Sequence, residues 1–464
     1  MTPNPGIIIV TGSNGRIGRA VMQRFAGRFG DVVGFDRKAP SPPPEHCVAV
    51  AVDITSDEGV RDGLRMIREH HGAHVASVIH LAAYYDFFGK PSSKYDEITV
   101  QGTARLLREL KAQNFQVEQF VFSSTMLVHR FGEPGEYINE DWPLEPTWAY
   151  PASKVRTEQL IRDERGTIPA VLLRISGVYD DGGHSIPLVH QIQRINERDL
   201  TSRFYSGSTA HGQSFMHMDD LVDAIERVVD RRAALPPEIA ILLGEPEPVS
   251  YDELQHTIAR LIRGANKETI ALPGALAPMA KVGAWMLDHV PGQEGFVKPW
   301  MIDRANDHYA LDITRARTLL GWEPKRTLRE TLPKMVAGMK ADPLGWYREN
   351  ELKPSKIEKT VGRAATPIAV ALQEAPTKSR KMHVHESRDD HGASAKPTHD
   401  HDHDHDHDHA PGHSNHPSPS GGMEGLEAGS DAPMAMAHGQ RPTWPHFAEH
   451  DLGRLAHHQR LRAR

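Results

Sequence analysis

The chain has 464 residues, a formal net charge of −7 and one cysteine, Cys47. The composition is mildly acidic, and the globular part has no dense block of lysine and arginine, which argues against nucleic-acid binding. A single cysteine excludes an internal disulfide framework and suits the reducing cytoplasm. The stretch IALPGALAPMAKVGAWML is too broken by prolines and Lys281 to span a membrane, and no basic region precedes the first apolar run, so neither a membrane span nor a signal peptide is expected.

Short apolar runs alternate with amphipathic stretches of helical length through the first 180 residues. A strand followed by a helix, repeated several times, predicts right-handed crossovers and a parallel sheet covered on both faces. We therefore expect an α/β protein with a doubly wound, Rossmann-type sheet. The expected strands are 7–11, 31–35, 47–53, 75–82, 119–124 and 170–176, and the expected helices are 15–28, one that follows residue 53 and ends at about 71, 93–114 and 149–165.

The alternation loosens after Tyr179, where a strand at 240–243 and helices near 251–262 and 313–320 predict a smaller substrate subdomain. From about residue 345 the chain is rich in Pro, Gly, Ser, Ala and His, which predicts a disordered tail. The predicted organisation is a cofactor domain at 1–178, an interleaved substrate subdomain at 179–344, and the tail at 345–464.

The first strand runs directly into TGSNGRIG, with Gly12, Gly15 and Gly18 spaced by three. A glycine turn between a strand and a helix lets backbone N–H groups approach a pyrophosphate. Asp36 ends the second strand, where a carboxylate can bind the adenosine ribose and repel a 2′-phosphate, so NAD is favoured over NADP, although Arg37 tempers this preference. Asp53, after the third strand, is either an adenine contact or a turn residue before Thr55.

Several motifs occur in the order found in the extended short-chain dehydrogenase/reductase family, also called the NAD-dependent epimerase/dehydratase family, and the chain resembles that family from about residue 7 to 339. The matching stretches are TGSNGRIG at 11–18, Asp36, Asp53-Ile54, HLAA at 80–83, SST at 123–125, Tyr150-x-x-x-Lys154, FMHMDD at 215–220 and LGWEP at 320–324. The resemblance implies an NAD-dependent enzyme, commonly a homodimer. It also implies cofactor contacts from Gly12, Asn14, Gly15, Arg16, Ile17, Gly18, Asp36, Asp53, Ile54, Leu81, Ala82, Ala83, Tyr150 and Lys154.

Tyr150 and Lys154 lie four residues apart, so on a helix they share one face. A tyrosine with a pKa of about 10 is a poor base at neutral pH, and lowering its pKa by roughly 3 takes about 4 kcal/mol, which a nearby ammonium can supply. By resemblance Tyr150 is the general acid/base, Lys154 lowers its pKa and holds the cofactor ribose, and Thr125 orients the substrate oxygen. Ser124 is the alternative to Thr125.

The chain departs from the family at positions that bind nucleotide sugars. Gly177 stands where the family has an asparagine, and Gln213 where it often has an arginine, so two groups that hold a diphosphate are lost. Met126-Leu127 replace the acidic pair of sugar 4,6-dehydratases, which disfavours dehydration. Thr99 replaces an asparagine of the fourth helix.

Aromatic residues follow the fourth strand, in AAYYDFFGK, at the edge where doubly wound sheets bind ligands. Tyr84, Tyr85, Phe87 and Phe88 there suit an apolar or aromatic ring of a substrate. The alternative is that two of the four are packing residues. Tyr84, Tyr85, Ser124, Gly177 and Gln213 are therefore the predicted substrate contacts.

The tail contains HDHDHDHDH at 401–409, which either binds Zn or Ni for storage or is a solvated segment with adventitious metal affinity. No metal is expected in the catalytic domain. The sequence thus predicts an oxidoreductase that transfers a hydride between NAD and a small-molecule secondary alcohol or ketone. A sugar 4-epimerase that retains NAD is the second hypothesis, and a non-catalytic dinucleotide- or metal-binding protein is the third.

Overall fold

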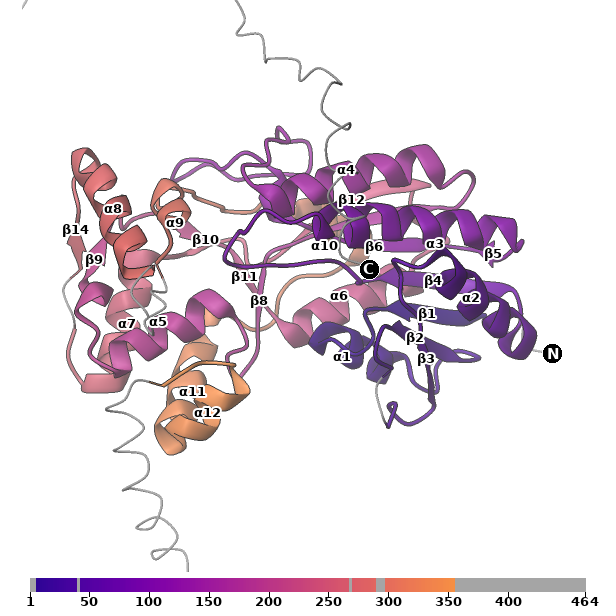
Figure 1. Ribbon diagram of the computed structural model, residues 1–464, viewed down its shortest axis with the longest axis horizontal. Coiled ribbons are helices and arrows are strands. Elements are labelled where there is room, and N and C mark those ends of the chain that lie inside the picture. The colour runs from indigo at the N-terminus through magenta and orange to yellow at the C-terminus, as the bar shows by residue number, and fades with distance from the viewer. Residues whose placement is uncertain (1–5, 40–41, 267–268, 289–296, 355–464) are drawn as a thin grey trace, which may run out of the picture. The chain divides into compact units, whose positions relative to one another are not determined.

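A parallel sheet forms the centre of the computed structural model, which describes residues 6–39, 42–266, 269–288 and 297–354 (Figure 1). Its strand order is β12-β7-β6-β4-β1-β2-β3, with the short β5 beside β4, and every pairing is parallel. The predicted doubly wound fold is confirmed. The strands are β1 Ile7–Thr11, β2 Val32–Asp36, β3 Cys47–Ala51, β4 His74–His80, β5 Gln116–Val117, β6 Phe120–Thr125, β7 Ala170–Ile175 and β12 Glu238–Leu243.

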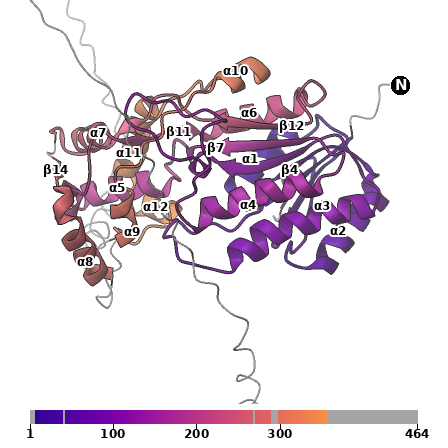
Figure 2. The same cartoon turned by 90° about the horizontal axis from the view of Figure 1, so that it is seen from above.

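Helices cover both faces of this sheet because its strands are apolar on both sides. Along β1, Ile8 and Val10 face one core, whereas Ile7 and Ile9 face the other. The first core is closed by α1 (Arg16–Phe25), α6 (Met218–Asp230) and α10 (Thr314–Leu320). The second is closed by α2 (Asp57–His71), α3 (Gln101–Ala112) and α4 (Ala149–Glu164), which lie side by side in Figure 2.

A third core joins four helices of the smaller part of the fold: α5 (Ile186–Asn196), α7 (Tyr251–Arg263), α11 (Leu328–Ala341) and α12 (Pro343–Glu349). Thr327 and Glu330 form a capping box at the start of α11, which satisfies backbone N–H groups that the helix leaves unpaired. The remaining elements are η1 Tyr95–Val100, η2 Met126–Val128, β8 Gly177–Tyr179, η3 Leu200–Arg203, β9 Phe204–Tyr205, β10 Gly212–Gln213, β11 Phe215–His217, β13 Val249–Ser250, β14 Ile270–Ala271, η4 Gly274–Leu276, α8 Ala277–Asp288 and α9 Pro299–Asp303.

Two assignments from the sequence differ from the structure. The strand expected in the smaller subdomain, at 240–243, is part of β12 and pairs with β7 in the main sheet, because its apolar residues fill both sheet cores. The tail was expected from residue 345, yet α12 is helical and buries Trp346 and Tyr347 against the third core. The change in composition near residue 345 therefore does not mark the end of the packed chain, because Trp346 and Tyr347 anchor α12.

The predicted tail from 355 onward, with the histidine repeat at 401–409, lies outside the described residues, and its predicted disorder stays a prediction. The division into domains at 178 also stays a prediction. Among the helices of the described ranges, none is both long enough and apolar enough to cross a bilayer.

Candidate active site

The glycine loop follows β1 at the point where the strand order reverses, between β1 and β4. Gly12 has a φ of +71°, and a Cβ there would lie 2.9 Å from the backbone nitrogen of Ala82. A Cβ on Gly18 would lie only 2.2 Å from the carbonyl oxygen of Gly12. Glycine is required at both positions, because the loop, the start of α1 and the end of β4 are in backbone contact.

The start of α1 has the properties of an anion site. The helix begins after Gly15, and no side chain caps its N-terminus or places an acidic group in its first turn. The carboxylate of Asp36, at the end of β2, accepts hydrogen bonds from the backbone N–H groups of Asn14 at 3.0 Å and Lys38 at 3.2 Å. The glycine cradle, the uncapped helix and Asp36 together fit a dinucleotide whose pyrophosphate lies over α1 and whose ribose lies beside Asp36.

A buried hydrogen-bond chain holds the ends of β1 and β4 together. Thr103 donates to the carbonyl of Thr99 at 2.6 Å and so accepts from Nε2 of His80 at 2.9 Å. Nδ1 of His80 then accepts from the hydroxyl of Thr11 at 2.7 Å, and that hydroxyl accepts from the N–H of Ala82 at 3.1 Å. Burial, and then the charge of Lys154, lowers the pKa of His80 to about 3, so the ring is a neutral structural link.

Three predicted catalytic residues come together at the carboxyl end of β6. Thr125 ends β6, Tyr150 lies in the first turn of α4, and the two side chains share a hydrogen bond. Lys154 is 2% exposed, its Nζ donates to the carbonyl of Ser123 at 2.6 Å, and Nζ lies 5.7 Å from the centroid of the Tyr150 ring. Pro151 is accommodated because the first turn of a helix does not use its N–H.

Burial sets the ionisation of this pair. It raises the pKa of the Tyr150 phenol well above its usual value, and the hydrogen bond with Thr125 opposes the rise only in part. Burial also lowers the pKa of the Lys154 ammonium to about 7, against the opposite effect of the Glu158 carboxylate. At neutral pH the phenol therefore holds its proton.

The catalytic helix is anchored by a buried ion pair one turn beyond Lys154. Glu158, with a side chain that is 0% exposed, accepts from Arg174 of β7 at 2.8 and 3.1 Å and from the hydroxyl of Ser124 at 2.6 Å. Burial disfavours the charged carboxylate, but Arg174 outweighs it and lowers the pKa of Glu158. Arg174 also donates to the carbonyl of Glu140 at 2.8 Å. Tyr150, Lys154 and Glu158 thus occupy one face of α4. The bonds of Glu158 to β6 and β7 fix the position of α4 along these strands, and with it the positions of Tyr150 and Lys154.

The comparisons with known proteins agree with this geometry. The model of the NAD dependent epimerase/dehydratase family matches residues 8–244, which is more than half of the chain. The chain belongs to this family.

Relatives within the epimerase/dehydratase family act on different molecules. The chain is 24% identical to dTDP-6-deoxy-L-talose 4-dehydrogenase of Kitasatospora kifunensis, over 73% of this chain and 98% of the relative. It is 21% identical to the decarboxylating sterol-4-alpha-carboxylate 3-dehydrogenase of Saccharomyces cerevisiae, over 62% and 81%. The structure of the UDP-glucuronic acid 4-epimerase from Bacillus cereus in complex with UDP-glucuronic acid and NAD superimposes with a TM-score of 0.54 at 20% identity, over 72% and 99%.

The structure places most of the predicted cofactor contacts around the glycine loop. Leu81 donates its backbone N–H to the carbonyl of Thr11, and Ala82 and Ala83 follow directly at the end of β4. Two predicted contacts also have local structural roles, and their contact with the cofactor stays a prediction: Asp53 accepts from the N–H and hydroxyl of Thr55 in a turn, and Ile54 packs against the second core, close to Gly102. Arg16 donates to the carbonyl of Glu349.

Among the predicted substrate contacts, Ser124 has another role. Its hydroxyl is buried and donates to Glu158, which favours Thr125 as the reactive hydroxyl of this segment. Gly177 lies against Phe215, with only 2.8 Å between a built Cβ and the ring, so a side chain at 177 requires the Phe215 ring to move. Gln213 is exposed on β10, where its backbone pairs with Val249.

The structure also adds site residues that sequence reasoning missed. Trp148, two residues before Tyr150, contacts the Tyr150 ring, and Trp300 stacks on Trp148. Glu158 and Arg174 anchor α4. The four-residue spacing of Tyr150, Lys154 and Glu158 could have indicated Glu158, whereas no pattern near residue 300 points to the site.

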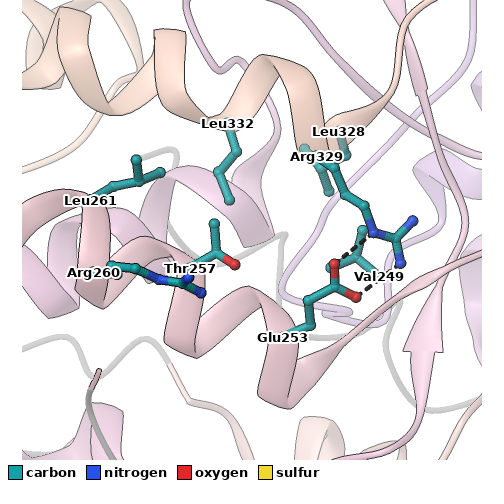
Figure 3. A pocket seen from close by; sticks show the side chains of 8 residues that line it. All are labelled: Val249, Glu253, Thr257, Arg260, Leu261, Leu328, Arg329 and Leu332. Carbon is teal, nitrogen blue, oxygen red and sulfur yellow. Dashed lines mark hydrogen bonds and ion pairs between the residues drawn. The ribbon is translucent and has the colours of Figure 1, made fainter. Parts of the chain in front are cut away.

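The smaller part of the fold has a separate surface pocket between α7 and α11, distant in the chain from every residue of the catalytic group (Figure 3). An ion pair between Glu253 and Arg329, with contacts of 2.6 and 2.8 Å, crosses it. Its lining residues are Val249, Glu253, Thr257, Arg260, Leu261, Leu328, Arg329 and Leu332. Among the described residues, no group of three or more His, Cys, Asp or Glu side chains could hold a metal ion.

Substitution of Gly18 by alanine is expected to weaken NAD binding by at least about tenfold, because the new Cβ forces the start of α1 away from Gly12. Calorimetric titration with NAD measures the change. Gly283→Ala is the matched control, since Gly283 is also helical and has no atom within 4 Å of a built Cβ. Wild-type affinity in Gly18→Ala would contradict the assigned cradle.

Substitution of Glu158 by glutamine is expected to lower the free energy of unfolding by about 3 kcal/mol, because it leaves the buried guanidinium of Arg174 without its counter-charge. Urea unfolding measures the difference. Glu253→Gln breaks the partly exposed pair with Arg329 and should cost less than about 1 kcal/mol. An equal loss of unfolding free energy in Glu158→Gln and Glu253→Gln would show that the buried pair with Arg174 is no more important for stability than the partly exposed pair with Arg329.

Proposed function

We propose that the protein is an NAD-dependent oxidoreductase that interconverts a secondary alcohol and a ketone, with Tyr150 as general acid/base. The observation that carries the proposal is the meeting of Thr125, Tyr150 and Lys154 at the same sheet edge as the glycine loop. Membership of the epimerase/dehydratase family supports the use of NAD, which when bound accepts or returns the hydride.

Thr125, Tyr150 and Lys154 each have a separate role in the reaction. The hydroxyl of Thr125 and the phenol of Tyr150 both reach the substrate oxygen, so that oxygen is held by two hydrogen bonds before a proton moves. In ketone reduction the phenol donates its proton to the oxygen, and in alcohol oxidation it takes the proton back. The Lys154 ammonium, fixed by Ser123, stabilises the phenolate in the second case and adds a donor toward the cofactor ribose.

A second candidate is a 4-epimerase that keeps NAD bound and returns the hydride to the opposite face. The names of relatives favour it, among them the UDP-glucose 4-epimerase of Erwinia amylovora at 26% identity. The packing of Gly177 on Phe215 counts against a nucleotide-sugar substrate, because the asparagine that would help to bind it is absent and a side chain there would displace the Phe215 ring. A net oxidoreductase is therefore the first choice.

The partner of this site is a small molecule. The homodimer and the cytoplasmic location that the sequence predicts stay predictions, as does metal binding by the repeat at 401–409.

Substitution of Tyr150 by phenylalanine is expected to lower kcat by about 10²- to 10⁴-fold and to leave NAD affinity within about threefold, because only the proton-transferring oxygen is lost. Release of NADH, followed by absorbance over a panel of sugars, aldonic acids, sterols and aryl alcohols, measures turnover. Stoichiometric NADH release supports the oxidoreductase, and turnover without NADH release supports the epimerase. Unchanged turnover in the variant would exclude Tyr150 from the chemistry.

Alcohol oxidation is expected to accelerate as the pH rises, because the buried phenol must lose a proton before it can act as a base, and to lose part of this gain above about pH 7, where Lys154 gives up the charge that stabilises the phenolate. Ketone reduction, which uses the protonated phenol, should show no such rise. Thr125→Ala removes the hydrogen bond that lowers the pKa of Tyr150, so its profile of kcat/KM against pH should shift to higher pH. A profile that stays in place would show that Thr125 does not act on Tyr150.

A further inference from the structure

Two aromatic side chains, Tyr85 and Trp148, contact the ring of the catalytic tyrosine, and Trp300 and Phe87 extend this contact further; we call Tyr85, Phe87, Trp148 and Trp300 the aromatic wall. The Tyr85 ring meets the Tyr150 ring edge-on at 4.8 Å, and the Trp148 ring meets it at 5.5 Å. Trp300 stacks on Trp148 at 5.4 Å with an interplanar angle of 23°, and Phe87 meets Trp300 at 6.1 Å. The four rings are thus linked to one another through ring contacts that include the Tyr150 ring.

Polar contacts at its edges hold this wall in place. The indole N–H of Trp300, on α9, donates to the carbonyl of Phe88 at 2.8 Å, and Arg304, just after α9, donates to Thr147. A Cβ on Gly89 would lie 3.3 Å from the Trp300 indole nitrogen, so the backbone there passes close to the ring. α9 therefore connects the segment after β4 to the start of α4. These contacts orient the rings of the aromatic wall before a ligand binds, which lowers the entropic cost of stacking a ligand on the rings.

The rings of the wall are partly open to solvent. Tyr85 is 50% exposed, and Phe87, Trp148 and Trp300 are each only partly buried. Core packing alone would bury such large apolar rings, and a connected, solvent-accessible group of them beside catalytic residues is the property of a binding surface for an apolar ligand.

Two cationic side chains beside the wall, Arg304 and Lys298, each contact another group of the protein. Arg304 is engaged by Thr147 and lies 3.6 Å from the Asp307 carboxylate. Lys298 lies over the Phe88 ring at 5.3 Å. Gly177 is closed by Phe215, and Gln213 is neutral. Positions 177 and 213 therefore supply none of the charge-assisted donors that would offset the loss of a diphosphate's hydration.

We infer that the hydroxyl or ketone of the substrate is carried on a flat, uncharged, apolar ring system that stacks on the aromatic wall, and not on a sugar joined to a nucleoside diphosphate. This inference rests on the proposed function, because the reacting oxygen is placed at Tyr150. It explains in one step the ring surface, the closed position at 177 and the neutral side chain at 213.

Ligand binding tests the inference without turnover. The full chain carrying Tyr150→Phe and saturated with NAD is titrated calorimetrically with three alcohols of one, two and three rings: 1-phenylethanol, 1-indanol and 1-acenaphthenol. UDP-glucose is titrated in parallel. The tightest ring alcohol is expected to bind at least tenfold more tightly than UDP-glucose, with affinity rising with ring number. Equal or tighter binding of UDP-glucose would overturn the inference, as would no binding of any ring alcohol.

Variants of the wall locate the binding surface. Tyr85→Ala and Trp300→Ala should weaken binding of the tightest ring alcohol by about three- to tenfold each, and Trp300→Phe should keep most of the affinity. Tyr137→Ala is the matched control, since Tyr137 is 49% exposed against 50% for Tyr85 and lies outside the wall. Unchanged affinity in both wall variants would overturn the inference.

The two proposals fail in different ways. If the proposed function is wrong, Tyr150→Phe keeps its turnover or the wild-type protein does not bind NAD, whatever the titrations show. If only the substrate class is wrong, Tyr150→Phe abolishes turnover of a nucleotide sugar, and that sugar binds equally well to the wall variants.

Discussion

The hydrogen bond from the buried ammonium of Lys154 to the carbonyl of Ser123 determines the geometry of the site. It joins the middle of α4 to the end of β6, and it satisfies one donor of a charge that would otherwise be too costly to bury. Because the helix cannot slide along the strand, Tyr150 stays level with Thr125. Glu158 and Arg174 repeat this connection one turn later, to β7, so the helix is attached to two adjacent strands.

The parts of the site that follow from the sequence are those encoded within a short stretch of chain. The glycine loop, Asp36 and the pair Tyr150 and Lys154 each combine a local pattern with a predictable backbone, and the structure places them at the predicted strand and helix ends. The direction of Ser124 could not be predicted, because neighbouring hydroxyls on a strand differ only by the face they point to. The contact of Trp300 with Trp148 joins residues 152 positions apart, and no local rule encodes such a pairing.

The smaller part of the fold is connected to the sheet through a buried carboxylate. Glu245, just after β12, accepts from the backbone N–H of Leu328 at the start of α11 and from the hydroxyl of Tyr179. Burial raises the pKa of Glu245 to about 7, although both donors favour its charged form. Through Glu245 the end of β12 is hydrogen-bonded to the first turn of α11, which connects the main sheet to the smaller part of the fold.

The contact between Gly177 and Phe215 limits how this protein can change its specificity. Gly177 and Phe215 lie directly opposite each other on the paired strands β8 and β11. A variant with asparagine at 177 therefore needs a smaller or displaced side chain at 215. Their substitutions are therefore non-additive, and the order in which they occur matters. A smaller residue at 215 makes room for a later asparagine at 177, whereas an asparagine introduced first meets the Phe215 ring.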